Sequence, residues 1–174
     1  MPSRILTHSF TVDAAPAVVA AHLADPHSYL GLSPLIVAVR EVHAVDGRPG
    51  VTGYTAVERF SALGLHYDNL IAVTLAADES DEGRQVVGGN VVSPGGVRLS
   101  YRYTIEPGGS STGASTTGVT DASVTDAAAR VTDTITVHAP FGLLRFASGQ
   151  ARSVQLSRAL ILAQRLAPRD ALTR

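Results

Sequence analysis

Apolar and polar side chains alternate at the start of the chain. Over residues 4–13, "RILTHSFTVD", Leu6, Phe10 and Val12 share one parity, and threonine or serine occupies positions 7, 9 and 11. A half-buried β-strand requires this period of two. The pattern therefore predicts an opening strand over 4–13.

Two short helical pieces are predicted next. Pro16 suits the first position of a helix, because its φ is already helical and its missing N–H would have no partner there. A helix is therefore expected over 16–24. The dipeptide Asp25-Pro26 ends it, since the residue before a proline is pushed out of the α region. The stretch "HSYLGLSP" is expected to hold one more helical turn.

The middle of the chain predicts a run of strands. Segments rich in β-branched and aromatic residues begin at Leu35 with "LIVAVREVHAV" and continue at about 52–62, 65–77, 84–93, 97–106 and 129–139. Clusters of glycine, proline and aspartate separate most of them, as in a meander of antiparallel hairpins. A bulge or sharp bend is expected at Gly88 and Gly89. The segment 107–128 has only two valines among small and polar residues, so it predicts a flexible hairpin loop.

The longest helix is expected near the C-terminus, from Pro140 to about Leu166. On a helical wheel, its inner stripe consists of Leu143, Phe146, Ala147, Gln150, Val154, Ser157 and Ile161. The rear of the helix carries a second apolar strip, formed by Leu156, Leu160, Ala163 and Ala167. Either another part of the chain covers this strip, or a second copy does so in a homodimer.

The order of elements is a strand, two short helices, six strands and a long helix. This order predicts an α+β fold, in which an antiparallel sheet curves around the C-terminal helix to bury its apolar stripe. The length of 174 residues fits one domain over 1–174.

Composition excludes several classes of function. The chain has no cysteine, which excludes a disulfide framework and a thiolate zinc site. All 14 basic residues are arginine, so no lysine is present to form a Schiff base or complete a P-loop. This residue usage is typical of a GC-rich genome, and a bacterial source is expected. A net charge of −1 argues against nucleic acid as a partner.

No cofactor or metal ion is predicted. The six histidines, at 8, 22, 27, 43, 66 and 138, lack the spacings of a metal site, and no dinucleotide-binding or P-loop motif occurs. The N-terminus lacks the apolar region of a signal peptide, and the tract "ALILA" at 159–163 is too short to span a membrane. A cytoplasmic location is therefore expected.

Three segments carry a resemblance to a known family: "FTVDAAPAVVAAHLADPHSY", "LSPLIVAV" and "ARVTDTITVHAPFGLLRFASGQARSVQLSRALILAQRL". They resemble the START-like, or Bet v 1-like, superfamily called SRPBCC, including its polyketide cyclase/dehydrase branch. The resemblance covers nearly the whole chain apart from 107–128. It implies a helix-grip fold, with a curved antiparallel seven-stranded sheet wrapped around the long C-terminal helix and two short helices after the first strand.

The resemblance also implies a deep, mainly apolar cavity between the sheet and the last helix, closed at one end by the two short helices. His27 and Tyr29 lie where the resemblance places the cavity mouth, and an ordinary surface-loop position is the alternative for His27. The predicted ligand-binding residues are Tyr67, Asn69, Tyr101, Tyr103, Phe146, Gln150 and Val154. Apolar walls with a few hydrogen-bonding groups are typical of small-molecule pockets. The alternative is a packed core whose tyrosine hydroxyls reach water or backbone.

No catalytic residue is established by the sequence, and the candidates are Glu58, Tyr67 and Tyr103. If the side chain of Glu58 faces inward, desolvation raises its pKa toward neutrality and suits it to acid–base chemistry. If it faces outward, it is simply solvated. Asp133 raises the same question, and it could pair with Arg102 across the sheet.

Three functions are compatible with these patterns. The first is binding of a hydrophobic small molecule, aromatic or lipid-like, in the cavity. The second is an enzyme that resembles polyketide cyclases and aromatases and acts in the same cavity. The third is a protein-interaction module that uses the C-terminal helix over a filled core. A cavity below about 300 Å³ would favour the third function.

Overall fold

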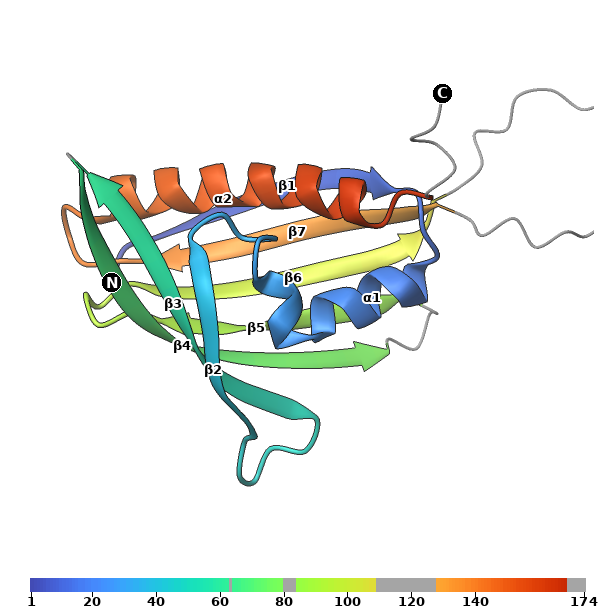
Figure 1. The fold of residues 1–174 in the computed structure, drawn as a ribbon, viewed down its shortest axis with the longest axis horizontal. Helices are drawn as coiled ribbons and strands as arrows, with labels where there is room; N and C mark the ends of the chain where they lie inside the picture. The colour runs from blue at the N-terminus through green and yellow to red at the C-terminus, as the bar shows by residue number, and fades with distance from the viewer. Residues whose placement is uncertain (63, 80–83, 109–127, 169–174) are drawn as a thin grey trace, which may run out of the picture.

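The computed structural model describes residues 1–62, 64–79, 84–108 and 128–168 (Figure 1). The elements are β1 (Ser3–Val12), α1 (Pro16–Ala24), a 3-10 helix η1 (Pro26–Tyr29), β2 (Ile36–Ala44), β3 (Val51–Ala62), β4 (Leu65–Glu79), β5 (Gln85–Val92), β6 (Arg98–Pro107), β7 (Ala129–His138) and α2 (Leu144–Arg165). The strands form one antiparallel sheet of seven strands in the order β1-β7-β6-β5-β4-β3-β2. The helix-grip fold class is thereby confirmed.

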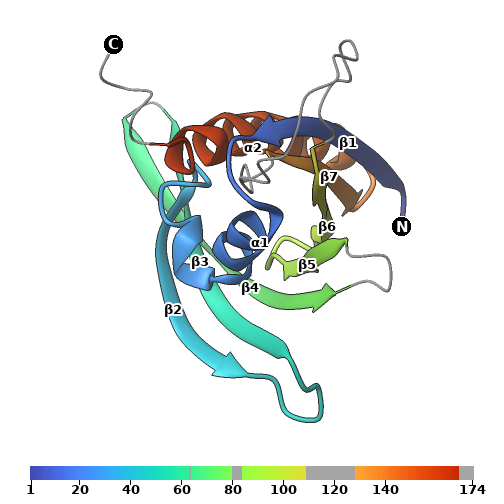
Figure 2. The same ribbon diagram turned by 90° about the vertical axis from the view of Figure 1, so that its right-hand side faces the viewer.

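The sheet curves around both helices (Figure 2). The helix α2 packs along β1 and β7, at one side of the sheet, whereas α1 packs against β5, β6 and β4. The core between them is apolar, because each strand alternates and turns one parity inward. Its largest fully buried side chains include Leu23, Leu32, Leu75, Ile105 and Leu162.

The predicted strands and the first helix lie within about two residues of their observed bounds, as expected for strongly patterned segments. The extra helical turn after Pro26 is the 3-10 helix η1, and the carboxylate of Asp25 caps it by accepting a hydrogen bond from the His27 N–H at 2.9 Å. No bulge interrupts the pairing of β5 with β4 and β6 at Gly88 and Gly89, so the predicted bulge was wrong, and the alternative of a sharp bend stays a prediction.

The predicted start of the last helix was also wrong. The helix α2 begins at Leu144, four residues after Pro140. The segment between them is a turn, in which the Leu143 N–H donates to the Pro140 carbonyl at 3.1 Å and Gly142 has a φ of 92°. A left-handed residue cannot continue a helix, so Pro140 is not the first helical residue.

The predicted hairpin loop over 107–128 falls mostly outside the described residues. Its base is described: β6 and β7 pair up to Pro107 and Ala129, which makes the connection a hairpin. The flexibility of this loop stays a prediction, and so does the single domain over 1–174. Among the described helices, none is long and apolar enough to cross a membrane.

The rear strip of α2 is partly exposed. Leu160 is 67% exposed and Leu156 is 39% exposed, whereas Ala163 and Ala167 are half-buried. The alternative that a second copy covers this strip in a homodimer stays a prediction.

Candidate functional site

A cavity of about 480 Å³ lies between the concave face of the sheet and α2. Its apolar lining consists of Leu35, Ile36, Phe60, Ile71, Val73, Val91, Val97, Leu99, Ile135, Leu143, Phe146, Ala147, Ala151 and Val154. Its polar lining consists of Tyr29, Ser33, Tyr54, Glu58, Tyr67, Asn69, Ser93, Tyr101, Gln150 and Arg158. The volume lies within the range of about 300–1,000 Å³ that is usual for small-molecule sites.

On each strand of the cavity wall, residues of one parity face the cavity. On β4, Tyr67 and Asn69 line the cavity together with the aliphatic residues that follow on the same parity. On β3, Tyr54 and Glu58 line it, which settles the open question of which parity of this strand faces inward. Of the seven residues predicted to bind a ligand, all but Tyr103 lie in the lining. Whether these residues contact a ligand stays a prediction.

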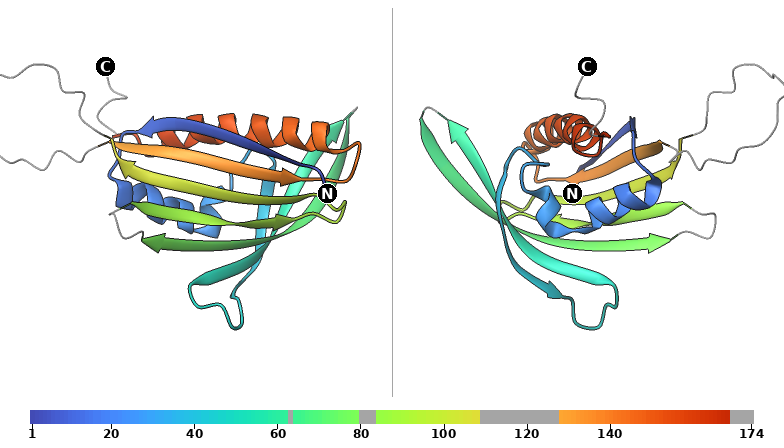
Figure 3. Two further views of the ribbon diagram at one scale, coloured as in Figure 1. Left: turned by 180° about the vertical axis from the view of Figure 1, so that it is seen from behind. Right: turned by 45° about the vertical axis from the view of Figure 1, so that its right-hand side comes forward.

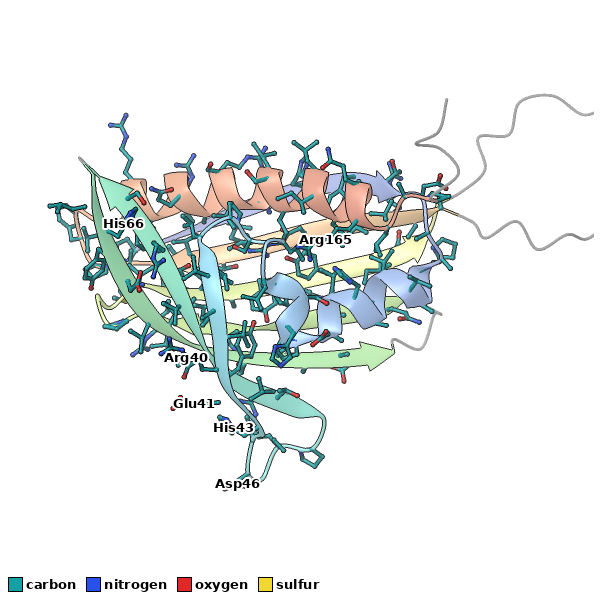
Figure 4. All side chains as sticks on the ribbon, in the orientation of Figure 1. Arg40, Glu41, His43, Asp46, His66 and Arg165 are labelled. Atoms are coloured by element: carbon teal, nitrogen blue, oxygen red, sulfur yellow. The ribbon has the colours of Figure 1, made fainter. Side chains whose placement is uncertain are left out.

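The open end of the cavity lies between the start of β4 and the start of α2. Tyr67 is 66% exposed there and Phe146 is 62% exposed, although both line the cavity. In Figure 4, His66 labels the start of β4 at this end.

The opposite end is closed by α1 and η1. Tyr29 is buried there, and its hydroxyl donates to the Leu23 carbonyl at 3.0 Å. Arg165, near the end of α2, donates to the carbonyls of Ser28 and Leu30 at 2.8 and 2.7 Å (Figure 4). The expected mouth at His27 and Tyr29 is corrected accordingly: His27 is exposed and outside the lining, and Tyr29 belongs to the closed end.

Arg158 is the central polar group of the inner cavity, and sequence reasoning missed it. Its guanidinium lies 5.7 Å from the ring centre of Tyr29 and 5.9 Å from that of Tyr103, which is within the range of cation–π attraction. Its Nη1 donates to the Tyr103 hydroxyl. Its Nε is buried and has no hydrogen-bond partner. Among the described residues, no carboxylate forms an ion pair with it.

Arg158 nevertheless stays charged. Burial lowers the pKa of its guanidinium, but the neighbouring Tyr103, Asp133 and Tyr29 outweigh that effect and hold the pKa above its ordinary value. The cavity therefore presents a positive charge with unused hydrogen-bonding capacity inside a mainly apolar wall.

A signal for Arg158 exists in the sequence. It lies four residues after Val154 and four before the buried Leu162, on an apolar stripe of α2. The predicted inner stripe included Ser157 and Ile161, which do not line the cavity, and left out Arg158, which does. In the structure the fully buried positions of α2 are Ser148, Gln155, Ala159 and Leu162.

Asp133 lies on the inner face of β7, directly opposite Tyr103 of β6, and is only 1% exposed. The proposed partner Arg102 is exposed on the other face, so that pairing was wrong. The Oδ1 atom of Asp133 has no hydrogen-bond partner. Burial raises the pKa of its carboxyl to about 6, although Arg158 and Gln155 oppose the shift.

Asp133→Asn is expected to stabilise the protein above pH 6. Because the folded-state pKa of about 6 exceeds the ordinary 3.8, the folded protein retains a proton that the unfolded chain has lost between these values. The contribution of Asp133 to the free energy of unfolding is therefore fully present at low pH and is lost as the pH rises through 6. The total loss is roughly 3 kcal/mol. In urea unfolding from pH 4 to 8, the free energy of unfolding of Asp133→Asn should increase relative to that of the wild type. The control Asp46→Asn, at an exposed position, should show no such trend. A constant difference would contradict the prediction.

Glu58 is half-buried in the cavity wall. Its Oε2 accepts a hydrogen bond from the Asn69 side-chain amide at 3.2 Å, and the same amide nitrogen lies 3.3 Å from the Ser93 hydroxyl. Burial raises the pKa of Glu58, while Asn69 and Arg158 lower it less strongly. The solvated alternative was therefore wrong. The carboxyl group of Glu58 therefore faces the cavity, with a pKa above its ordinary value.

The tyrosines differ in what their hydroxyls can reach. The Tyr101 hydroxyl donates to the Thr74 carbonyl at 3.3 Å. A Cβ atom on residue 89 would lie only 2.9 Å from the oxygen of this hydroxyl. The glycine at position 89 thus allows the Tyr101 hydroxyl to approach the backbone closely. Tyr103 is 1% exposed, and its hydroxyl accepts a hydrogen bond from Arg158. Tyr54, which the site prediction left out, is buried in the lining, and burial raises its pKa to about 12.

Solved structures share this architecture at low sequence identity. A START superfamily protein from Mycobacterium smegmatis matches with a TM-score of 0.61 and 13% identity, over 97% of this chain and 99% of that one. The aromatase/cyclase ZhuI from Streptomyces sp. R1128 matches with a TM-score of 0.60 and 16% identity, over 97% and 98%. The chain has the START-like fold. Norcoclaurine synthase from Thalictrum flavum shares this START-like fold, with a TM-score of 0.55 and 11% identity over 94% and 96%.

The predicted resemblance is confirmed at the level of the fold. No family model matches the chain, and no curated protein matches it. At identities of 11–16%, the role of a site residue cannot be transferred from these neighbours to this chain. The function therefore has to be argued from the cavity itself.

Proposed function

We propose that the protein binds a hydrophobic small molecule in the cavity and holds an anionic or carbonyl oxygen of that molecule against Arg158. The volume of about 480 Å³ supports this proposal, because it suits an aromatic or lipid-like molecule of moderate size. A volume below about 300 Å³ would favour the alternative of a protein-interaction module with a filled core. The observed cavity is larger than this.

The observation that carries the proposal is the state of Arg158. Burying a guanidinium costs several kcal/mol unless its charge and its N–H groups are satisfied. Here the aromatic faces of Tyr29 and Tyr103 and one hydroxyl supply part of that compensation, and Nε has no partner. An oxygen of a ligand would supply the remainder, in a low-dielectric site where a charge-assisted hydrogen bond is strong.

In this proposal the aromatic and aliphatic walls contact the body of the ligand. Tyr67 and Phe146 frame its entry, and Asn69, Tyr101 and Gln150 offer polar contacts along the wall. Tyr103 acts by positioning Arg158. The cytoplasmic location and the absence of cofactor, metal and nucleic-acid partners stay predictions. Among the described residues, no group of three histidine, aspartate or glutamate side chains could hold a metal ion.

Native mass spectrometry of freshly purified protein tests the binding function directly. A bound small molecule that is displaced by aromatic or acyl probes would support it. A protein that is empty as purified, and has no measurable affinity for such probes, would overturn it.

A second candidate is proton transfer on a ligand in the same cavity, which Glu58 favours. The carboxylate of Glu58 would take a proton from the carbon next to a ligand carbonyl. The electron pair of that C–H bond would form a C=C bond, and the π pair of the carbonyl would move onto its oxygen. Arg158 would stabilise the resulting enolate. Two structural neighbours, by their names, are an aromatase/cyclase and a synthase, which is compatible with this candidate.

Exchange of the acidic protons of an aromatic ketone in D2O, followed by NMR, tests this candidate. The wild-type protein should accelerate the exchange, and Glu58→Gln should reduce the acceleration by about 100-fold or more. Glu41→Gln, at an exposed position of β2, is the matched control. An unchanged rate in Glu58→Gln would remove Glu58 from the chemistry.

A further inference from the structure

A second hollow lies at the edge of the sheet, outside the cavity. It has a volume of about 510 Å³ and lies between β1 and α2. Its lining consists of Arg4, Ile5, Leu6, Thr7, Arg145, Ser148, Gly149 and Arg152, and these residues are called the basic groove below. None of them lines the cavity. Figure 3 shows β1 running alongside α2 at this edge.

The basic groove concentrates positive charge in a chain whose net charge is −1. The three arginines are its only charged lining residues, as far as the structure describes the chain. The surrounding elements have the same bias: the 22 residues of α2 include four arginines and no acidic residue, and β1 has one arginine and no acidic residue. Within the described residues, neither Arg4 nor Arg145 forms an ion pair.

Arg152 is held in place without being neutralised. Its Nη1 donates to the Thr7 carbonyl at 3.1 Å and to the Gln155 side-chain oxygen at 2.9 Å. Both acceptors are uncharged, so the full positive charge of Arg152 remains at the wall of the basic groove.

A buried hydroxyl in the same lining points to a ligand. Ser148 is only 1% exposed, and its Oγ has no hydrogen-bond partner. Backbone donors add to it. The carbonyl of Thr7 faces α2, and in an antiparallel strand the N–H of the same residue points to the same side. Because β1 is the edge strand, this N–H is not used by a neighbouring strand.

The start of α2 increases the attraction for an anion. Arg145 lies in its first turn, where the helix dipole is positive and a cation is unfavourable. No acidic residue lies in that turn, and Leu143, at the N-cap, provides no capping side chain. A bound anion would relieve this local repulsion.

We propose that the basic groove binds the phosphate group of a soluble phosphorylated small molecule. Arginine guanidinium groups match the oxygens of a phosphate, and the Ser148 hydroxyl and the backbone N–H of Thr7 complete a set of donors. The volume leaves room for a molecule larger than phosphate alone. The basic groove shares no residue with the cavity, so this site stands or falls independently of the proposed function.

Calorimetric titration with inorganic pyrophosphate, at an ionic strength held constant with sodium chloride, tests the proposal. Saturable binding to one site is expected. Arg145→Gln and Arg4→Gln should each weaken it at least fivefold. Within the described part of the chain, neither residue has a side-chain hydrogen bond that its replacement would break. Arg48→Gln, in the exposed turn between β2 and β3, is the matched control and should bind like the wild type. Val154→Trp, which alters only the cavity, should also bind like the wild type.

Three outcomes would overturn the proposal. The first is an absence of saturable binding. The second is an equal loss in Arg48→Gln, which would indicate general charge screening. The third is binding to phosphatidylcholine vesicles that contain phosphatidylglycerol, without binding to pyrophosphate, which would assign the basic groove to a lipid surface.

Discussion

Replacing Arg158 with glutamine is expected to weaken binding of the anionic aromatic probe anilinonaphthalene sulfonate by about 10- to 100-fold. The sulfonate would lose its charged partner in the inner cavity, where Nε of Arg158 is buried and unpartnered in the free protein. A hydrogen bond to a charged group is worth about 1.5–3 kcal/mol, which corresponds to this loss. Fluorescence titration of purified wild type and variant measures it.

A neutral probe and a distant arginine are the controls. Nile red has no charged group, so its affinity should change far less in Arg158→Gln. Arg102→Gln removes an exposed arginine on the outer face of β6 and should leave both affinities unchanged. An equal loss for the two probes in Arg158→Gln would show that Arg158 maintains the shape of the cavity and does not recognise an anion.

Val154→Trp is expected to remove the binding of both probes. Val154 lines the cavity from α2, and an indole at this position would fill space that the ligand needs. We expect an affinity at least 100-fold below that of the wild type, because the indole would occupy part of the space beside Arg158 and clash with a bound aromatic ring. Fluorescence titration measures the affinity, and urea unfolding verifies that the variant is folded.

Leu160→Trp provides the matched control. Leu160 is on the same helix but is 67% exposed on its rear face, so a tryptophan there adds the same bulk outside the cavity. Binding should be retained. If Val154→Trp kept the affinity of the wild type while remaining folded, the probes would bind elsewhere, and the cavity would not be the ligand site.

The wall of the cavity on the strands could be predicted because its pattern is local. Successive side chains of a strand point to opposite faces, so Tyr67 and Asn69 had to share a face with the aliphatic residues of β4. For β3 the pattern left both faces open. Packing decided it, since Tyr54 and Glu58 turn toward α2 and the exposed Arg59 pairs with Asp68 on the outside, at 2.7 Å.

The polar interior of the site could not be predicted in the same way. Which stripe of α2 faces inward depends on how the helix rests on β1 and β7, and the turn after Pro140 delays its start. The orientation of α2 about its axis brings Arg158 to the cavity wall and places Gln155 next to Asp133. The backbone carbonyl of Asp133 accepts a hydrogen bond from the Gln155 amide at 3.0 Å. These contacts join residues far apart in the chain, so no local period reports them.

The sequence by itself determined the order of the elements, the antiparallel sheet and the inward parity of most strands, because these follow from local periods of two and from proline and glycine signals. Only the tertiary structure decided where the cavity opens, which residues meet at Arg158 and how far Asp133 and Glu58 are removed from water. Those properties depend on the curvature of the sheet and on the seating of α1 and α2 against it, which are set by long-range packing.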